Sequence, residues 1–140
     1  MAGFNNTPPA SEFRNATSWG RTRQPKNLAG ANTTPLAAPT TDNPTVVTDG
    51  YATENQRFLH VSLKNAAADV LTVQIWAYSH AFGTWGILTD VRGTAATVTA
   101  NDSTAHKVIE ISGVDRVYFK KTGASTFAGA DALFAAASTF

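Results

Sequence analysis

All six prolines of this 140-residue chain lie within its first 50 residues. Proline fixes φ at about −65°, lacks a backbone N–H donor and biases the preceding residue toward extended geometry. Their spacing excludes a long helix or an interior strand from this part of the chain. The segment also buries too little apolar surface to offset its ordering entropy, because its branched aliphatic residues are limited to Leu28, Leu36, Val46 and Val47. We therefore predict that residues 1–50 form an extended N-terminal arm with little regular structure.

The predicted arm carries aromatic and basic residues that suit partner binding: Phe4, Phe13, Trp19, Arg21 and Arg23. Each aromatic ring contributes roughly 1.5–3 kcal/mol if it is buried in a partner's pocket, and Trp and Arg are frequent interface anchors. The basic stretch 21–26 also resembles a short nucleic-acid-binding arm. Eleven basic against ten acidic residues leave a net charge of +1, which disfavours nucleic acid as the partner.

Beyond residue 50 the sequence changes to short runs of alternating polarity. In residues 70–78, Leu71, Val73 and Ile75 share one face, whereas Trp76 and Tyr78 lie on the other. Such period-two patterns, rich in β-branched and aromatic residues, indicate strands. Residues 65–69 suit a hairpin loop between two of them. The predicted strands cover residues 57–64, 70–78, 86–91, 95–100, 106–112, 116–122 and 130–140.

These six to seven strands predict an antiparallel β-sandwich or β-barrel-like domain over residues 51–140. The last segment is ambiguous because alanine favours helix, but Phe134, Ala136 and Ser138 alternate and favour a strand. Nothing long enough for a helical crossover separates the strands, which disfavours a parallel sheet. The composition thus places a boundary near Gly50.

The sequence offers little for catalysis. It has no cysteine, so a disulfide scaffold, a thiolate metal site and a cysteine nucleophile are excluded. His60, His80 and His106 are too far apart for the common metal-binding motifs. No nucleophile elbow, phosphate loop or paired carboxylates occur. We expect no enzymatic activity, no cofactor and no metal.

Residues 81–86 hold Phe82 and Trp85 between glycines, next to Trp76 and Tyr78 on the adjacent strand. Such rings can form a stacking platform for a sugar. They also suit a buried face or a subunit interface. We favour the core or interface interpretation for these four aromatic residues.

No apolar run approaches the roughly 20 residues needed to cross a bilayer. The N-terminus lacks the basic start and apolar core of a secretory signal, and the absence of cysteine fits assembly in a reducing cytoplasm. We expect neither membrane insertion nor secretion.

The arm, the small cysteine-free β domain and the run 111–119 (Ile-Ser-Gly-Val-Asp-Arg-Val-Tyr-Phe), interpreted as a hairpin, resemble small structural proteins of tailed-bacteriophage virions. They are most like capsid decoration, or cement, proteins. This resemblance implies a β-sandwich or β-tulip-like module on the outside of the head, a homo-oligomer with a trimer favoured, and an arm lying across capsid subunits.

The function implied by the resemblance is stabilisation of the capsid. The expected partner is the major capsid protein or another virion protein, on a virion assembled in the host cytoplasm, and the family brings no catalytic residues. Two alternatives remain at this point. One is a tail, neck or fibre-attachment protein, and the other is a carbohydrate-binding β-sandwich module.

Overall fold

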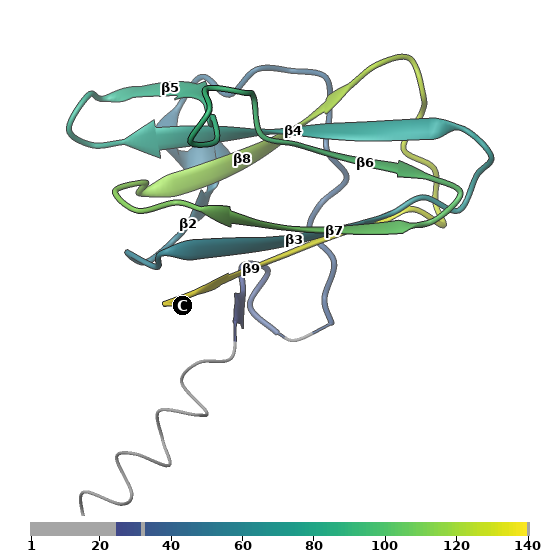
Figure 1. Ribbon diagram of the computed structural model, residues 1–140, viewed down its shortest axis with the longest axis horizontal. Coiled ribbons are helices and arrows are strands. Elements are labelled where there is room, and N and C mark those ends of the chain that lie inside the picture. Colours follow the sequence, from purple (N-terminus) through teal and green to yellow (C-terminus); the bar gives the residue numbers. More distant parts are fainter. Residues whose placement is uncertain (1–24, 32, 140) are drawn as a thin grey trace, which may run out of the picture.

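The computed structural model describes residues 25–31 and 33–139, which form two antiparallel sheets packed face to face (Figure 1). Sheet A has the strand order β1 (Lys26–Asn27), β9 (Ala132–Ser138), β3 (Phe58–Lys64) and β7 (Thr104–Glu110). Sheet B has the order β2 (Tyr51–Ala52), β8 (Arg116–Thr122) and β4 (Val70–Ser79), followed by β5 (Thr84–Ile87) and β6 (Thr97–Asn101). β5 and β6 both pair with β4, each along a different part of it.

The pairing pattern is that of one long hairpin wrapped into two layers. β1 pairs with β9, β2 with β8, β3 with β7, and β4 with β5 and β6, so the tip of the hairpin lies at β5 and β6. Further pairing of β3 with β9 and of β4 with β8 closes the wrap. This is the strand order of a jelly roll, a sandwich of two Greek keys, in which β5 and β6 share one strand position. The predicted antiparallel β-sandwich is confirmed.

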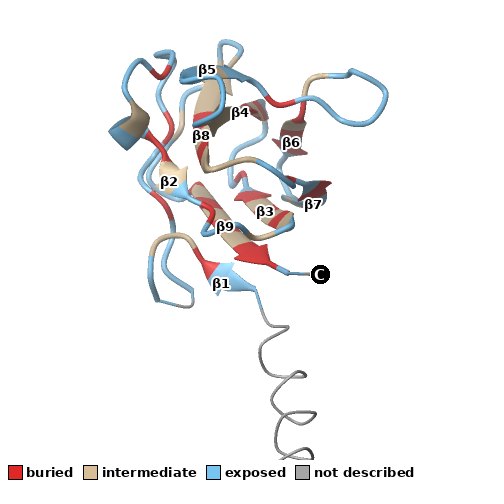
Figure 2. Cartoon of the chain, turned by 90° about the vertical axis from the view of Figure 1, so that its left-hand side faces the viewer, coloured by how far each residue is buried: buried red, intermediate tan, exposed pale blue. Residues whose placement is uncertain are grey.

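The core lies between the sheets and follows the alternation of the sequence (Figure 2). In β3 and the first six residues of β4 every second residue is buried, and the same holds through most of β8 and β9. Each fully buried aliphatic side chain stabilises the fold by roughly 1.5–3 kcal/mol. The largest core side chains with no exposed surface are Leu59, Leu63, Leu71, Ile75, Val73, Val117 and Leu133.

Two predicted hairpins are wrong. Residues 65–69 connect β3 in sheet A to β4 in sheet B, and these strands do not pair. Likewise, the run 111–119 passes from β7 in sheet A to β8 in sheet B. Alternation identifies strands but not their partners, and in this topology successive strands mostly change sheets.

The predicted strand over residues 86–91 is also displaced. It begins at Thr84 and ends at Ile87, because a tight turn after β4 brings Gly83, at φ 68°, within 2.8 Å of the Ser79 carbonyl oxygen. Trp85 therefore lies in β5, although the predicted strand begins one residue after it. β6 begins at Thr97, two residues later than predicted, and β9 confirms a strand near the C-terminus.

Residues 25–31 and 33–50 differ from the predicted free arm, because they pack on the β domain. The Leu28 and Leu36 N–H groups donate to the Ala135 and Leu133 carbonyls of β9 at 2.9 and 2.7 Å. Further along, the Thr40 carbonyl accepts from Lys121 N–H of β8 at 2.8 Å. This stretch, called here the closing segment, runs from the edge of sheet A to the edge of sheet B. Its regular structure is limited to β1 and the 3-10 helix η1 (Val47–Asp49).

Burial confirms that the closing segment belongs to the fold. Leu36 is 5% exposed and joins the core, and Pro39 and Pro44 are buried. Proline suits this position because the edge of a sheet tolerates a missing N–H donor. The composition boundary at Gly50 is therefore not a boundary between structural units for these residues.

Candidate functional site

The predicted partner-binding residues Phe4, Phe13, Trp19, Arg21 and Arg23 lie outside the described residues. The described chain starts at Pro25, directly before β1 at the edge of sheet A. Among the other candidates, the structure places Trp76, Tyr78 and Trp85 on sheet B and Phe82 in the turn between β4 and β5.

Three rings form an aromatic cluster on the outer face of sheet B: Tyr78, Trp85 and Tyr118. The Tyr78 and Trp85 ring centroids are 5.4 Å apart, and those of Trp85 and Tyr118 are 6.0 Å apart. Tyr118 was missed by the sequence analysis, although it alternates with the buried Val117 and Phe119 and so had to face outward. Trp76 lies opposite Tyr118, with Lys120 Nζ 5.9 Å from its ring centroid.

The closing segment is bonded to this cluster. Trp85 Nε1 donates to the Val46 carbonyl at 3.0 Å, and the Tyr118 hydroxyl donates to the Asp42 carbonyl at 2.8 Å. Arg116 donates to the Gly50 carbonyl. The rings are thereby half-buried and hold the segment on the sheet. This arrangement favours the structural interpretation of Trp85 and Tyr78 over a sugar-stacking platform.

Phe82 differs from the other three aromatic candidates of the sequence analysis because 83% of its surface is exposed. It lines a groove of about 300 Å³ beside β5 that is also lined by Trp85, Ile87 and Val114. Ile87 is 44% exposed. This groove, called here the β5 groove, is therefore an apolar surface open to solvent.

His80 and Asp115 form a polar pair near the same end of sheet B. The His80 backbone N–H donates to Asp115 Oδ2 at 2.6 Å, and His80 Nδ1 lies 3.0 Å from the same oxygen. The backbone hydrogen bond, followed by the side-chain one, lowers the pKa of Asp115. Both interactions link the turn after β4 to the chain entering β8, which is a structural role.

The other two histidines lie on the outer face of sheet A. His60 Nε2 is 2.8 Å from the Ser138 hydroxyl, and His106 Nδ1 is 2.6 Å from that of Ser62. Partial burial lowers the pKa of His60. The fold does not gather His80 with these two, and no group of three metal-ligating side chains occurs among residues 25–31 and 33–139.

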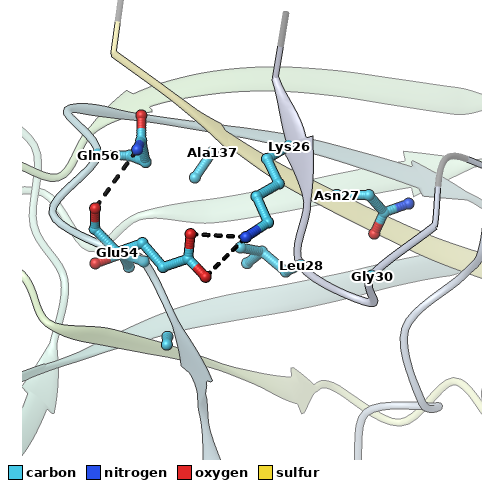
Figure 3. Close-up of a pocket in the computed structure, with 9 residues that line it drawn as sticks. Lys26, Asn27, Leu28, Gly30, Glu54, Gln56 and Ala137 are labelled. Atoms are coloured by element: carbon cyan, nitrogen blue, oxygen red, sulfur yellow. Dashed lines mark hydrogen bonds and ion pairs between the residues drawn. The ribbon is translucent and has the colours of Figure 1, made fainter. Parts of the chain in front are cut away.

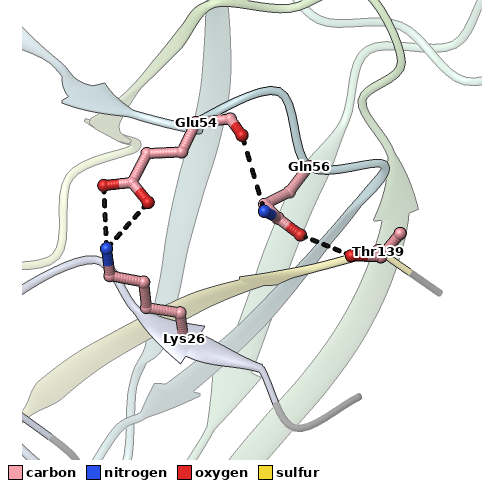
Figure 4. A network of polar contacts seen from close by, with 4 residues as sticks. All are labelled: Lys26, Glu54, Gln56 and Thr139. Atoms are coloured by element: carbon pink, nitrogen blue, oxygen red, sulfur yellow. Dashed lines mark hydrogen bonds and ion pairs between the residues drawn. The ribbon is translucent and has the colours of Figure 1, made fainter. Parts of the chain in front are cut away.

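A small cavity of about 210 Å³ lies between β1 and the residues around β2 (Figure 3). Lys26 Nζ contacts both carboxylate oxygens of Glu54 at 2.8 and 2.7 Å. Gln56 donates to the Glu54 carbonyl and accepts from the Thr139 hydroxyl at 2.9 Å (Figure 4). The ion pair is more than half exposed, so it contributes about 0–1 kcal/mol. The network fastens both ends of the described chain to one end of the sandwich.

Within the described chain, no helix is long and apolar enough to cross a membrane. Comparison of the chain with known proteins gave no match to a family model, to a curated protein or to a solved structure.

Proposed function

We propose that the protein is a structural component of a phage virion that binds the outside of the capsid and stabilises it. The jelly roll contributes to this proposal because it recurs in viral capsid domains, although the same fold also serves lectins and other proteins. The resemblance of the chain to decoration proteins supplies the capsid as the partner.

The observation that carries the proposal is the packing of the closing segment on the β domain, which makes residues 25–31 and 33–50 part of the folded unit. Residues 25–31 and 33–139 account for both sheets, the closing segment and the core. Phe4, Phe13, Trp19, Arg21 and Arg23 all precede this unit. We assign capsid docking to residues 1–24, which shortens the predicted arm by about half.

A protein that binds only the assembled shell stabilises it by mass action, because binding favours the state that offers the site. Several arms on one shell surface add avidity without a larger folded domain. Neither effect needs a catalytic group.

The test is co-sedimentation of the full-length protein with purified heads of the phage that encodes it. The triple variant Phe4→Ala, Phe13→Ala, Trp19→Ala is compared with a control that carries three alanine substitutions at Asn5, Asn6 and Thr7. Binding of the wild type and the control, with loss for the aromatic variant, supports the proposal. Equal binding by all three would keep capsid binding but overturn the assignment of docking to these three rings. Failure of the wild type to sediment with heads overturns the proposal itself.

The tail, neck or fibre-attachment alternative is separated by copy number. A head-surface protein is present in many copies per particle, whereas a protein at the unique vertex is present in few. The carbohydrate alternative rests on the exposed Phe82 ring beside Trp85, and glycan-array binding that is lost in Phe82→Ala would favour it.

A further inference from the structure

Among the described residues, β5 is an edge strand with one unpaired side. It pairs with β4 through Trp76–Ile87, Ala77–Gly86, Tyr78–Trp85 and Ser79–Thr84. β6 pairs with a different part of β4, and within the described residues no strand pairs with the other side of β5 (Figure 1). A row of backbone donors and acceptors is therefore available there.

The hydrogen bonding of the next residue shows which groups are available. Leu88 N–H donates to the Ile75 carbonyl of β4 at 3.0 Å. Because backbone groups alternate in direction along an antiparallel strand, those of Trp85 and Ile87 point away from β4. Within the described chain, the Trp85 carbonyl receives a long 3.4 Å contact from the Thr84 hydroxyl.

The unpaired side lacks the usual protection against pairing. Edge strands are commonly guarded by lysine, proline or a bulge, but β5 reads Thr-Trp-Gly-Ile and has no charge. β7, at an edge of sheet A, carries Lys107, whose Nζ donates to the Thr97 carbonyl of β6 at 3.0 Å. That edge is bridged to its neighbour, and β5 is not.

Exposed apolar side chains surround the same edge. Phe82 is 83% exposed, Ile87 44% and Val46, whose carbonyl accepts from Trp85, 54%. Phe82 and Ile87 line the β5 groove of about 300 Å³. An unpaired backbone edge beside an apolar groove is the arrangement used for strand addition by a second chain.

We propose that the β5 edge docks against the β5 edge of a second copy of this chain, in antiparallel pairing about a two-fold axis at Gly86. In this register Trp85 of each copy exchanges both backbone hydrogen bonds with Ile87 of the other, so the edge is self-complementary. Because β5 has no charged side chain, this pairing places no like charges opposite each other. At the two-fold axis the Gly86 residues of the two copies lie opposite each other. A side-chain carbon added at Gly86 would have no neighbouring atom within 4 Å in the single chain.

This proposal is independent of capsid binding, and a cysteine test addresses it directly. The chain has no cysteine, so a single introduced thiol can form a disulfide only between copies. In the proposed pairing the two residues at position 86 form a non-hydrogen-bonded pair with Cα atoms about 4.5 Å apart, within the range of about 4.4–6.8 Å for a disulfide. Gly86→Cys in the full chain should form a covalent dimer on mild oxidation.

The matched control is Thr99→Cys, an exposed position on β6 of the same sheet. We expect rapid dimerisation of Gly86→Cys and at least tenfold slower dimerisation of Thr99→Cys at the same concentration. Equal rates for the two variants would mean that cross-linking reflects random collision, and they would refute the proposed pairing.

Association of the unmodified chain is the second test, measured by light scattering over a concentration series. Ile87→Lys places a charge at the edge and should weaken dimerisation at least tenfold, whereas Val70→Lys, an exposed aliphatic position on β4, should leave it unchanged. A monomer at every concentration, a trimer, or a dimer insensitive to Ile87→Lys would each overturn the proposal. A monomer that binds an extended apolar peptide at β5 would assign the edge to another partner.

Discussion

Gly50 lies directly against the indole ring of Trp85, where the closing segment leads into β2. A side-chain carbon at Gly50 would overlap that ring and would lie 2.5 Å from the Val117 carbonyl oxygen. The close approach explains why glycine occupies this position although its φ of −106° is open to any residue. It also provides a test of how tightly the closing segment is held.

Gly50→Ala should destabilise the fold by about 1–3 kcal/mol, because the backbone carbonyl cannot move aside as a flexible side chain would. The free energy of unfolding is measured by urea titration. Gly129→Ala is the control, since nothing lies within 4 Å of its added carbon, and it should stay within about 0.5 kcal/mol of the wild type. Equal effects of the two substitutions would contradict the packing of Gly50 on Trp85.

Leu36→Ala should cost about 2–5 kcal/mol, because this side chain is 5% exposed and packs in the core. Val46→Ala, in the same segment but 54% exposed, should change stability by less than about 0.5 kcal/mol. Both are measured by thermal and urea unfolding. A negligible effect of Leu36→Ala would show that the closing segment does not contribute to the folded domain.

Tyr118→Phe should cost about 0.5–1.5 kcal/mol, the net value of one hydrogen bond, because it removes the 2.8 Å bond to the Asp42 carbonyl while keeping the ring. Limited proteolysis should cut the segment around Asp42 faster in this variant. Unchanged stability and unchanged cleavage together would show that the bond does not hold the closing segment.

Asp115→Asn should destabilise the protein at neutral pH and lose this effect in acid. The pKa of Asp115 is lowered in the folded protein from its ordinary value of 3.8, first by the backbone N–H and then by the side chain of His80. A depressed pKa means that the carboxylate contributes stability above the unfolded-state pKa, and this contribution disappears as the pH falls through the folded-state value.

The measurement is the difference in Tm between the wild type and Asp115→Asn from pH 7 down to pH 2, and the difference should shrink below about pH 4. Asp102→Asn removes the same formal charge from an exposed turn and serves as the control. A difference in Tm that is constant with pH would contradict the role assigned to the ionised carboxylate.

The strands and their buried faces could be predicted because alternation is a local property. Leu71, Val73 and Ile75 face the core as the sequence indicates, and Trp76 faces outward. Strand pairing depends on contacts between residues distant in the sequence. For this reason the local pattern predicts hairpins at 65–69 and 111–119, although each segment joins two sheets.

The composition of the closing segment was misleading for a physical reason. Its few apolar residues cannot form a core by themselves, but Leu36 needs only to complete a core built by the two sheets. Proline at positions 39 and 44 excludes an interior strand without excluding a buried extended chain. Proline content therefore predicted the extended conformation and not whether the segment is free.

The sequence does not show which of the candidate aromatic side chains are exposed and which are packed. Phe82 and Trp85 are close neighbours in residues 81–86. Phe82 is exposed, whereas the Trp85 ring packs against Gly50 and donates a hydrogen bond to the Val46 carbonyl. That difference arises from a segment about 40 residues upstream, which no local pattern reveals.

We propose that residues 1–24 bind the capsid, and we expect the remainder of the chain to fold without them. The most direct measurement is co-sedimentation of a variant lacking residues 1–24 with phage heads, beside its thermal unfolding. We expect a cooperative transition within a few degrees of the full-length Tm and loss of head binding. A folded truncated protein that still decorates heads as well as the full chain would contradict the claim.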